Sequence, residues 1–159
     1  MRPKLYVLIG VPAAGKSSWL AVQPFDWNLT VVVSSDGHIE RYAKSLDKTY
    51  NEVFNDYAPS AMQLMHADVA SAVELGYDIC WDQTNTSVKA RASKLKAVPD
   101  TYEKIAVMFM TPDDAEHAIR LAGRPDKKIP DSVMSRMKAQ LELPTEKEGF
   151  DKIIYVDNK

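Results

Sequence analysis

The chain has 159 residues, of which 45% are hydrophobic and 26% charged, and its formal net charge is −2. This size and composition are typical of one soluble globular domain. The mild acidity argues against a protein coated in basic residues for binding duplex nucleic acid, although a local basic groove is compatible with it. No apolar stretch approaches the ~18 residues of a membrane helix, and the single cysteine excludes an intramolecular disulfide, so we expect a cytoplasmic protein without a membrane partner.

Apolar runs rich in β-branched residues alternate with helical patterns along the chain. The runs span residues 4–9, 30–34, 77–81, 104–110 and 152–156. Unbroken runs of this kind suit strands that are buried on both faces of a parallel sheet. Cys80 lies in the third run and is predicted to be a core residue rather than a reactive thiol. The alternation predicts one α/β domain over residues 1–159, a three-layer sandwich around a five-stranded parallel sheet.

Helical patterns fill the segments between these runs. They cover residues 17–22, 36–45, 59–76, 87–98, 111–123 and 130–143. The third is the clearest, because Pro59 and Ser60 fit a helix start and Gly76 fits a helix stop. Apolar residues recur in it at steps of three and four, and this spacing predicts a core-facing stripe of Met62, Met65, Val69, Ala72 and Val73.

The stretch GVPAAGKSSW, residues 10–19, follows the first strand and contains the pattern G-x-x-x-x-G-K-S. Gly10 permits a sharp turn, and Gly15 lets backbone N–H groups approach an anion at the start of the next helix. Lys16 is predicted to reach the β- and γ-phosphates of ATP, and the hydroxyl of Ser17 to ligate Mg²⁺. Ser18 either helps the metal or caps the helix. The predicted nucleotide-binding residues of this loop are Gly10, Ala13, Ala14, Gly15, Lys16, Ser17 and Ser18.

An acidic residue, Asp36, follows the second strand in the stretch SSDGHIERYA. The carboxyl ends of parallel strands are where α/β folds place their ligands. A carboxylate there can accept the proton of an attacking hydroxyl and align that hydroxyl on the γ-phosphorus. The alternative is that Asp36 caps the following helix.

The stretch WDQTNTSVKAR places further polar groups at the end of the third strand. Asp82 can orient the water shell of Mg²⁺, so the candidate metal ligands are Ser17, Asp36 and Asp82. Thr84 and Asn85 can hydrogen-bond a substrate or fix the loop.

A predicted lid covers about residues 120–130 and contains IRLAGRPDKKIP. Arg120 and Arg124 lie one helical turn apart, and their guanidinium groups suit the oxygens of ATP and of a phosphoryl group in transfer. The alternative is a solvated basic turn at a helix end.

Taken in order, these stretches resemble the kinase domain of phage-type 5′-hydroxyl polynucleotide kinases, and they are similar to the wider group of small zeta-toxin-like P-loop kinases. The likeness runs over nearly the whole chain. It implies a P-loop fold in which Lys16 and Ser17 hold ATP and Mg²⁺. It also implies that Asp36 is the general base, that Asp82 is needed for activity, and that Arg124 contacts the transferred phosphate.

One departure concerns the acceptor. The polynucleotide kinases carry an arginine three residues after the base, where this chain has Ile39, and the nearest arginine is Arg41. Either Arg41 serves after a local shift or the acceptor differs. The candidate substrate-binding residues are Asp36, Arg41, Thr84 and Asn85.

Three functions follow. The first is an ATP-dependent kinase that acts on a hydroxyl of a nucleic acid, at a 5′ end or on a hydroxymethylated base. The second is a small-molecule kinase acting on a nucleoside, a nucleoside monophosphate or a sugar nucleotide, which the acidity and Ile39 favour. The third, a regulatory module without phosphoryl transfer, is disfavoured by Asp36 and the lid arginines. The helix of residues 87–98 offers either a basic acceptor channel or a solvated face, through Lys89, Arg91, Lys94 and Lys96.

Overall fold

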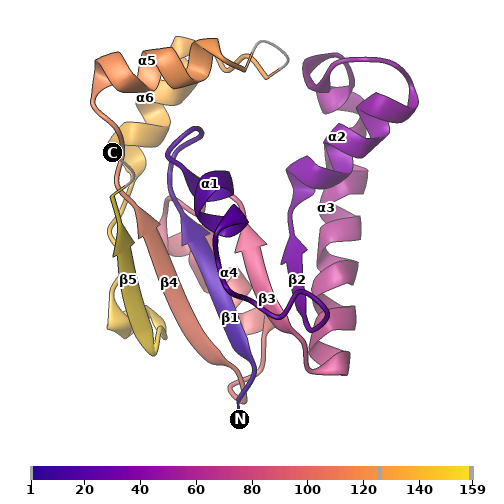
Figure 1. Ribbon diagram of the computed structural model, residues 1–159, viewed down its shortest axis with the longest axis vertical. Coiled ribbons are helices and arrows are strands. Elements are labelled where there is room, and N and C mark those ends of the chain that lie inside the picture. Colours follow the sequence, from indigo (N-terminus) through magenta and orange to yellow (C-terminus); the bar gives the residue numbers. More distant parts are fainter. Residues whose placement is uncertain (1, 125–126, 158–159) are drawn as a thin grey trace.

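A five-stranded parallel sheet forms the centre of the molecule in this computed structural model, which describes residues 2–124 and 127–157 (Figure 1). Every neighbouring pair of strands is parallel. In spatial order the strands are β2 (Thr30–Val33), β3 (Asp78–Asp82), β1 (Lys4–Ile9), β4 (Glu103–Phe109) and β5 (Lys152–Val156). The five predicted strands and their parallel arrangement are therefore confirmed, with ends that differ by a residue or so.

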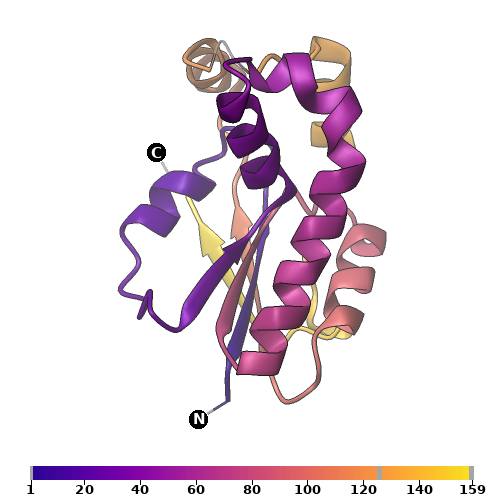
Figure 2. The same cartoon turned by 90° about the vertical axis from the view of Figure 1, so that its right-hand side faces the viewer.

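Helices cover the sheet on both faces, and Figure 2 shows α3 and α4 on one side of it and α1 on the other. The helices are α1 (Lys16–Ala21), α2 (Ser35–Ser45), α3 (Tyr50–Leu75), α4 (Val88–Ala97), α5 (Asp114–Ala122) and α6 (Asp131–Gln140), with a short 3₁₀ turn at Glu146–Glu148. None of the helices in the described part of the chain is long and apolar enough to cross a membrane.

The two faces of the sheet bury separate apolar clusters. On β1, Leu5 and Val7 join one cluster with residues of α3 and α4, while Tyr6 and Leu8 join the other with residues of α1 and α6. This alternation follows from the pleat of a strand, which turns successive side chains to opposite faces. Cys80 is fully buried in the second cluster, and burial raises the pKa of its thiol to about 12, as suits a core residue.

The long helix α3 corrects the sequence prediction, because it begins at Tyr50 and not at Pro59. Its start is fixed by a capping box, in which the side chains of Thr49 and Glu52 each bind the other residue's backbone N–H. Pro59 lies inside the helix, at a cost of about 3 kcal/mol in an isolated helix. Buried contacts of Val53 and Ala61 with α2 offset that cost.

The predicted core stripe of α3 is largely confirmed. Met65, Val69 and Ala72 are buried in the cluster against the sheet, and Val73 packs on its margin. Met62 differs, since it is exposed near the carboxyl edge of the sheet, where its sulfur lies 3.7 Å from the amide nitrogen of Gln83.

For the basic helix α4 the sequence predicted either a basic channel or a solvated face, and both predictions are wrong. Arg91 is fully buried, and its Nε and Nη2 atoms donate to the carboxylate of Glu148 at 2.8 and 3.0 Å. Lys94 is also buried, where it donates to Asn85 and lies 5.6 Å from the ring centre of Trp81. Only Lys89 and Lys96 are exposed in this set of four. The helix therefore uses two of its cations as structural supports, and neither a basic channel nor a fully solvated face is formed.

Replacing Arg91 by Ala tests this structural role. The carboxylate of Glu148 would remain buried without its partner, so we expect the free energy of unfolding to fall by about 3–5 kcal/mol. Urea denaturation measures the change. Lys96→Ala, at an exposed position of the same helix, is the control and should alter stability by less than about 0.5 kcal/mol. Unchanged stability combined with weaker acceptor binding would restore the channel interpretation.

Candidate active site

A cavity of about 870 Å³ opens at the carboxyl edge of the sheet, between the loop after β1, the start of α2, the end of β3 and the end of α5. Most of the side chains predicted for the site come together around it. Those that line it are Ala13, Gly15, Lys16, Ser17, Ser18, Asp36, Arg41, Asp82, Thr84, Arg120 and Arg124. Gly10, Ala14 and Asn85 do not line it, and each has a structural place instead.

The register of the sheet explains why these groups meet. Leu8 of β1 pairs with Asp82 of β3 on one side and with Val107 of β4 on the other. The last residue of β3 is therefore level with the end of β1, two residues before the loop begins at Gly10.

The loop after β1 owes its position to a close approach at Gly10. A Cβ atom there would lie 3.1 Å from the Cβ of Phe109 and 3.4 Å from that of Ala14, closer than side chains normally pack. The N–H of Gly10 donates to the carbonyl of Thr84 at 2.9 Å. Gly10 is thus needed for packing against β4 and the loop after β3, and Ala14 is buried beneath the loop.

Left-handed backbone at two positions shapes the rest of the loop. Gly15 has φ of 105° and is the N-cap of α1, and Ala13 has φ of 63°, which is uncommon for a residue with a side chain. Among the described residues, no side-chain hydrogen bond caps α1, whose first turn faces the cavity through Gly15, Lys16 and Ser17.

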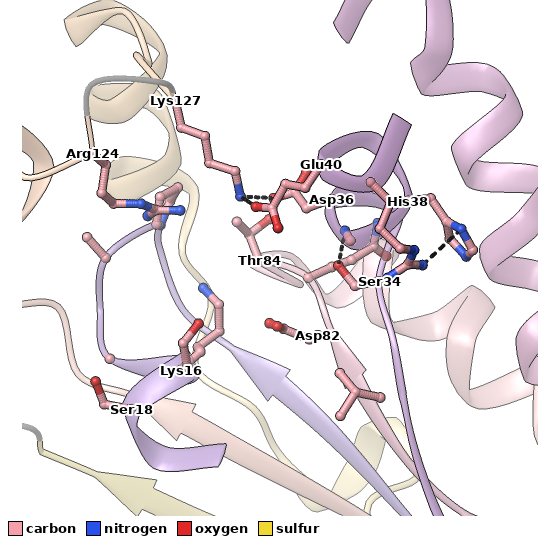
Figure 3. Close-up of a pocket in the computed structure, with 18 of the residues that line it drawn as sticks. Lys16, Ser18, Ser34, Asp36, His38, Glu40, Asp82, Thr84, Arg124 and Lys127 are labelled. Atoms are coloured by element: carbon pink, nitrogen blue, oxygen red, sulfur yellow. Dashed lines mark hydrogen bonds and ion pairs between the residues drawn. The ribbon is translucent and has the colours of Figure 1, made fainter. Parts of the chain in front are cut away.

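Lys16 extends from the start of α1 back over the loop. Its ammonium donates to the carbonyls of Gly10 at 2.8 Å and Val11 at 3.2 Å, and it faces Asp82 and Arg124 in the cavity (Figure 3). Burial of the charge lowers the pKa of Lys16 to about 8, although the nearby carboxylate of Asp82 acts in the opposite direction. The ammonium group of Lys16 is therefore partly desolvated, and two backbone carbonyls of the loop accept its hydrogen bonds.

Asp82, at the end of β3, has the complementary environment. Burial raises the pKa of its carboxyl group, and the ammonium of Lys16 limits the rise. The two groups stabilise each other's charged forms across the cavity floor.

Asp36 is not the cap of α2, which excludes the alternative left open by the sequence. Ser34 is the N-cap, and its hydroxyl accepts from the N–H of Gly37 at 3.2 Å. The half-exposed carboxylate of Asp36 borders the cavity, where its Oδ1 accepts from the Tyr50 hydroxyl at 2.7 Å and its Oδ2 lies 3.6 Å from the ammonium of Lys127.

Helix α5 is attached to the phosphate loop by two side chains. Arg120 donates from Nη1 to the carbonyl of Ala13 at 3.2 Å and from Nε to Glu116 at 3.0 Å. His117 is buried, and its Nε2 donates to the carbonyl of Pro12 at 2.7 Å. The role of His117 was missed because nothing in its local sequence indicates a contact with a loop more than a hundred residues away.

The predicted lid is described in part. Arg124 lies at the cavity with its guanidinium group turned toward it (Figure 3), and Lys127 points at the carboxylates of Asp36 and Glu40. Residues 125–126, which belong to the predicted lid, lie outside the described residues. The described part of the lid brings Lys127 to the carboxylate of Asp36, and this lysine was not among the predicted site residues.

At residue 39 the chain differs from the pattern of the polynucleotide kinases that its sequence resembles. Ile39 is buried between α2 and α3 and cannot reach the cavity. Arg41, two residues further on, lines the cavity, and its Nη2 donates to His38 Nδ1 at 3.1 Å. Because that nitrogen accepts, the other ring nitrogen carries the proton and donates to Asp68 at 2.6 Å.

Asn85 fixes the loop after β3, which was one of its two predicted roles. It is buried with φ of 48°, its amide donates to the carbonyl of Leu8 at 2.7 Å, and its oxygen accepts from Lys94. Thr84, by contrast, lines the cavity. Of these two residues, Thr84 therefore stays a candidate for binding substrate, whereas Asn85 has the alternative place, that of fixing the loop.

Comparison with known proteins places the chain in a family. A family model described as an AAA domain matches residues 5–144, which is most of the chain. The chain belongs to this family.

Several solved structures share the fold of this AAA-domain protein. A chain of the Pnkp1/Rnl/Hen1 RNA repair complex aligns with a TM-score of 0.67 and 22% identity, over 94% of this chain and 47% of that one, so this chain spans about half its length. A putative kinase from Chloroflexus aurantiacus aligns with a TM-score of 0.69 and 14% identity, over 99% of this chain and 86% of that one. Shikimate kinase from Acinetobacter baumannii aligns with a TM-score of 0.54 and 15% identity, over 100% of this chain and 86% of that one. The predicted P-loop kinase fold is thereby confirmed.

The titration of Lys16 gives a test of the phosphate loop in this AAA-domain protein. Above about pH 8 the lysine of the free protein loses its charge, so ATP affinity should fall by up to about tenfold per pH unit. Titration calorimetry between about pH 7 and 9 measures the change. Lys16→Met should bind ATP weakly and without this pH dependence. A flat profile for the unaltered chain would contradict the proposed contact between Lys16 and phosphate.

Proposed function

We propose that the chain is an ATP-dependent phosphotransferase that moves the γ-phosphate to a hydroxyl of a nucleic acid, with a 5′-hydroxyl end as the first candidate acceptor. One observation carries the proposal: a phosphate-loop lysine and a solvent-accessible carboxylate, Lys16 and Asp36, border the same cavity. Structures of the same fold include a chain of an RNA repair complex and a shikimate kinase, so the fold is compatible with large and small acceptors.

The donor side would be the loop after β1. Its backbone N–H groups and Lys16 suit the β- and γ-phosphates of ATP, while Arg120 and Arg124 approach from α5 and the residues after it. Arg120 already contacts the loop through Ala13, so Arg124 is the better candidate for the phosphoryl group in transfer. Guanidinium groups there would stabilise the charge on its equatorial oxygens.

Magnesium fits the residues present. Mg²⁺ prefers oxygen ligands and is commonly bound through one or two protein oxygens, with phosphates and water completing its shell. The hydroxyl of Ser17 and the carboxylate of Asp82 supply such oxygens at the cavity, and the ion would neutralise charge on the phosphates when bound. Asp36 stays a third candidate ligand, although its contacts are with Tyr50 and Lys127.

The chemical step would begin at Asp36. Its carboxylate accepts the proton of the acceptor hydroxyl, and the oxygen attacks the γ-phosphorus as the bond from that phosphorus to the bridging oxygen of ADP breaks. The cationic groups around the cavity, Lys16, Arg124 and Lys127, suit the charge that spreads over the phosphoryl oxygens.

The acceptor class is supported by Arg41. Its guanidinium group lines the cavity on the same helix as Asp36 and is held by His38, so it can bind an anion next to the accepting hydroxyl. The phosphate on the 3′ oxygen of a 5′-hydroxyl terminal nucleotide is an anion of this kind. The second candidate function, a small-molecule kinase, is favoured by the burial of Ile39, where polynucleotide kinases carry their acceptor arginine.

Asp36→Asn tests the proposed reaction. The variant should bind ATP as tightly as the unaltered chain but transfer phosphate about 10²–10⁴-fold more slowly, because the amide cannot take a proton. The assay uses γ-labelled ATP with 5′-hydroxyl DNA and RNA oligomers, hydroxymethylated duplex DNA, nucleosides and nucleoside monophosphates. Transfer at an unchanged rate would refute the role of Asp36, and labelling of small acceptors alone would favour the second function.

Arg41→Ala tests the acceptor class separately. Loss of the guanidinium group should raise the KM of an acceptor that carries a 3′-phosphate by about tenfold or more, because a charge-assisted hydrogen bond is lost. The KM of a nucleoside without that phosphate should not change. Arg136→Ala, at an exposed position of α6 outside the cavity, is the control. Equal effects on both acceptors would show that Arg41 does not bind the acceptor phosphate.

A further inference from the structure

The first turn of α3 reaches the candidate base from a separate element. Tyr50, the first residue of that helix, donates its hydroxyl to Asp36 Oδ1 at 2.7 Å. Asp36 sits in the first turn of α2, with a half-exposed side chain. A carboxylate in this position would sample several rotamers in water unless another group restrained it. The hydroxyl of Tyr50 supplies that restraint.

The surroundings of Tyr50 keep it in place as a donor. Its ring packs against Phe54 at 5.5 Å, and the ammonium of Lys127 lies 4.9 Å from the ring centre. Burial, with the hydrogen bond to Asp36 as the next cause, raises the pKa of Tyr50 above its ordinary value. The hydroxyl therefore keeps its proton throughout the pH range of a kinase assay.

The first turn of α3 also contacts the segment between α5 and α6. The amide of Asn51 makes a double contact with the backbone of Lys128, donating to its carbonyl at 3.0 Å and accepting from its N–H at 2.9 Å. Lys127 is in this way brought to Asp36 Oδ2 and to Glu40. The start of α3 thus sets two of the contacts around the carboxylate of Asp36.

We propose that Tyr50 is a positioning residue, which holds Asp36 Oδ1 so that Oδ2 can accept the proton of the acceptor hydroxyl. The inference rests on the proposed role of Asp36 as the base. The acceptor hydroxyl would take the place of the ion pair that Lys127 makes with Oδ2, while the bond to Tyr50 persists. Tyr50 itself neither touches the phosphate nor transfers a proton.

Several polar and charged groups surround the carboxylate of Asp36. Tyr50 from α3, Lys127 and the neighbouring Glu40 of α2 face it directly, and Lys16 and Asp82 act from across the cavity. Tyr50 is the neutral donor in this set, so removing its hydroxyl releases the carboxylate without removing a charge from the cavity. The loss should therefore appear in kcat and not in the binding of ATP.

The experiment compares Tyr50→Phe with the unaltered chain and combines it with Asp36→Asn. Tyr50→Phe keeps the ring and its packing and removes only the donor. We expect kcat to fall by about tenfold with the KM for ATP unchanged, a split that a general loss of structure would not produce. Tyr57→Phe, two turns along the same helix on a ring stacked against Tyr42, is the matched control and should change none of these quantities.

The double variant separates this inference from the proposed function. If Tyr50 acts through Asp36, adding Tyr50→Phe to Asp36→Asn should cause no further loss of kcat. A full tenfold loss in that background, or an unchanged kcat of the single variant, would overturn the positioning role. Full activity of Asp36→Asn alone would instead refute Asp36 as the base, whatever Tyr50 does.

Discussion

The close approach at Gly10 is the constraint on which the site depends. The backbone at this residue packs on Phe109 of β4 and bonds to the carbonyl of Thr84 after β3, so it joins three neighbouring strands at their carboxyl ends. The position of the loop after β1 is set by these two contacts. The loop after β1 leaves the sheet level with Asp82, the last residue of β3, so the carboxylate of Asp82 faces Lys16 at the start of α1 across the cavity.

Buried polar contacts then hold the elements that carry the other groups. Asn85 and Arg91 fix the loop after β3, because Asn85 donates to the carbonyl of Leu8 and Arg91 donates to the carbonyl of Asn85. His117 and Arg120 attach α5 to the loop after β1. Such contacts cost free energy to desolvate, and they are stabilising only when each group finds its partner. The walls of the cavity are therefore kept in place largely by specific hydrogen bonds.

Local patterns explain how much of this could be predicted from the sequence. The strands, the phosphate loop and the place of Asp36 after β2 depend on short-range periodicity and on the geometry of parallel sheets, and these predictions are confirmed for the fold. The burial of Arg91 could not be foreseen, because its partner Glu148 lies 57 residues further along the chain. Lys94 was missed although its partner Asn85 lies nine residues before it, because nothing in the sequence shows that Asn85 is buried. The start of α3 was predicted wrongly for another reason. Pro59 is typical of the first position of a helix, but the capping box of Thr49 and Glu52 begins the helix further upstream.

The proline inside α3 shows which contacts keep two parts of the site together. Because Pro59 lacks an N–H, it removes one bond of the helical ladder. Val53 upstream of it and Ala61 downstream of it both pack in the cluster with α2, so the helix is held against α2 on both sides of the proline. Asp36 at the start of α2 and Tyr50 at the start of α3 therefore belong to one packed pair of helices, and that packing supports the hydrogen bond between them.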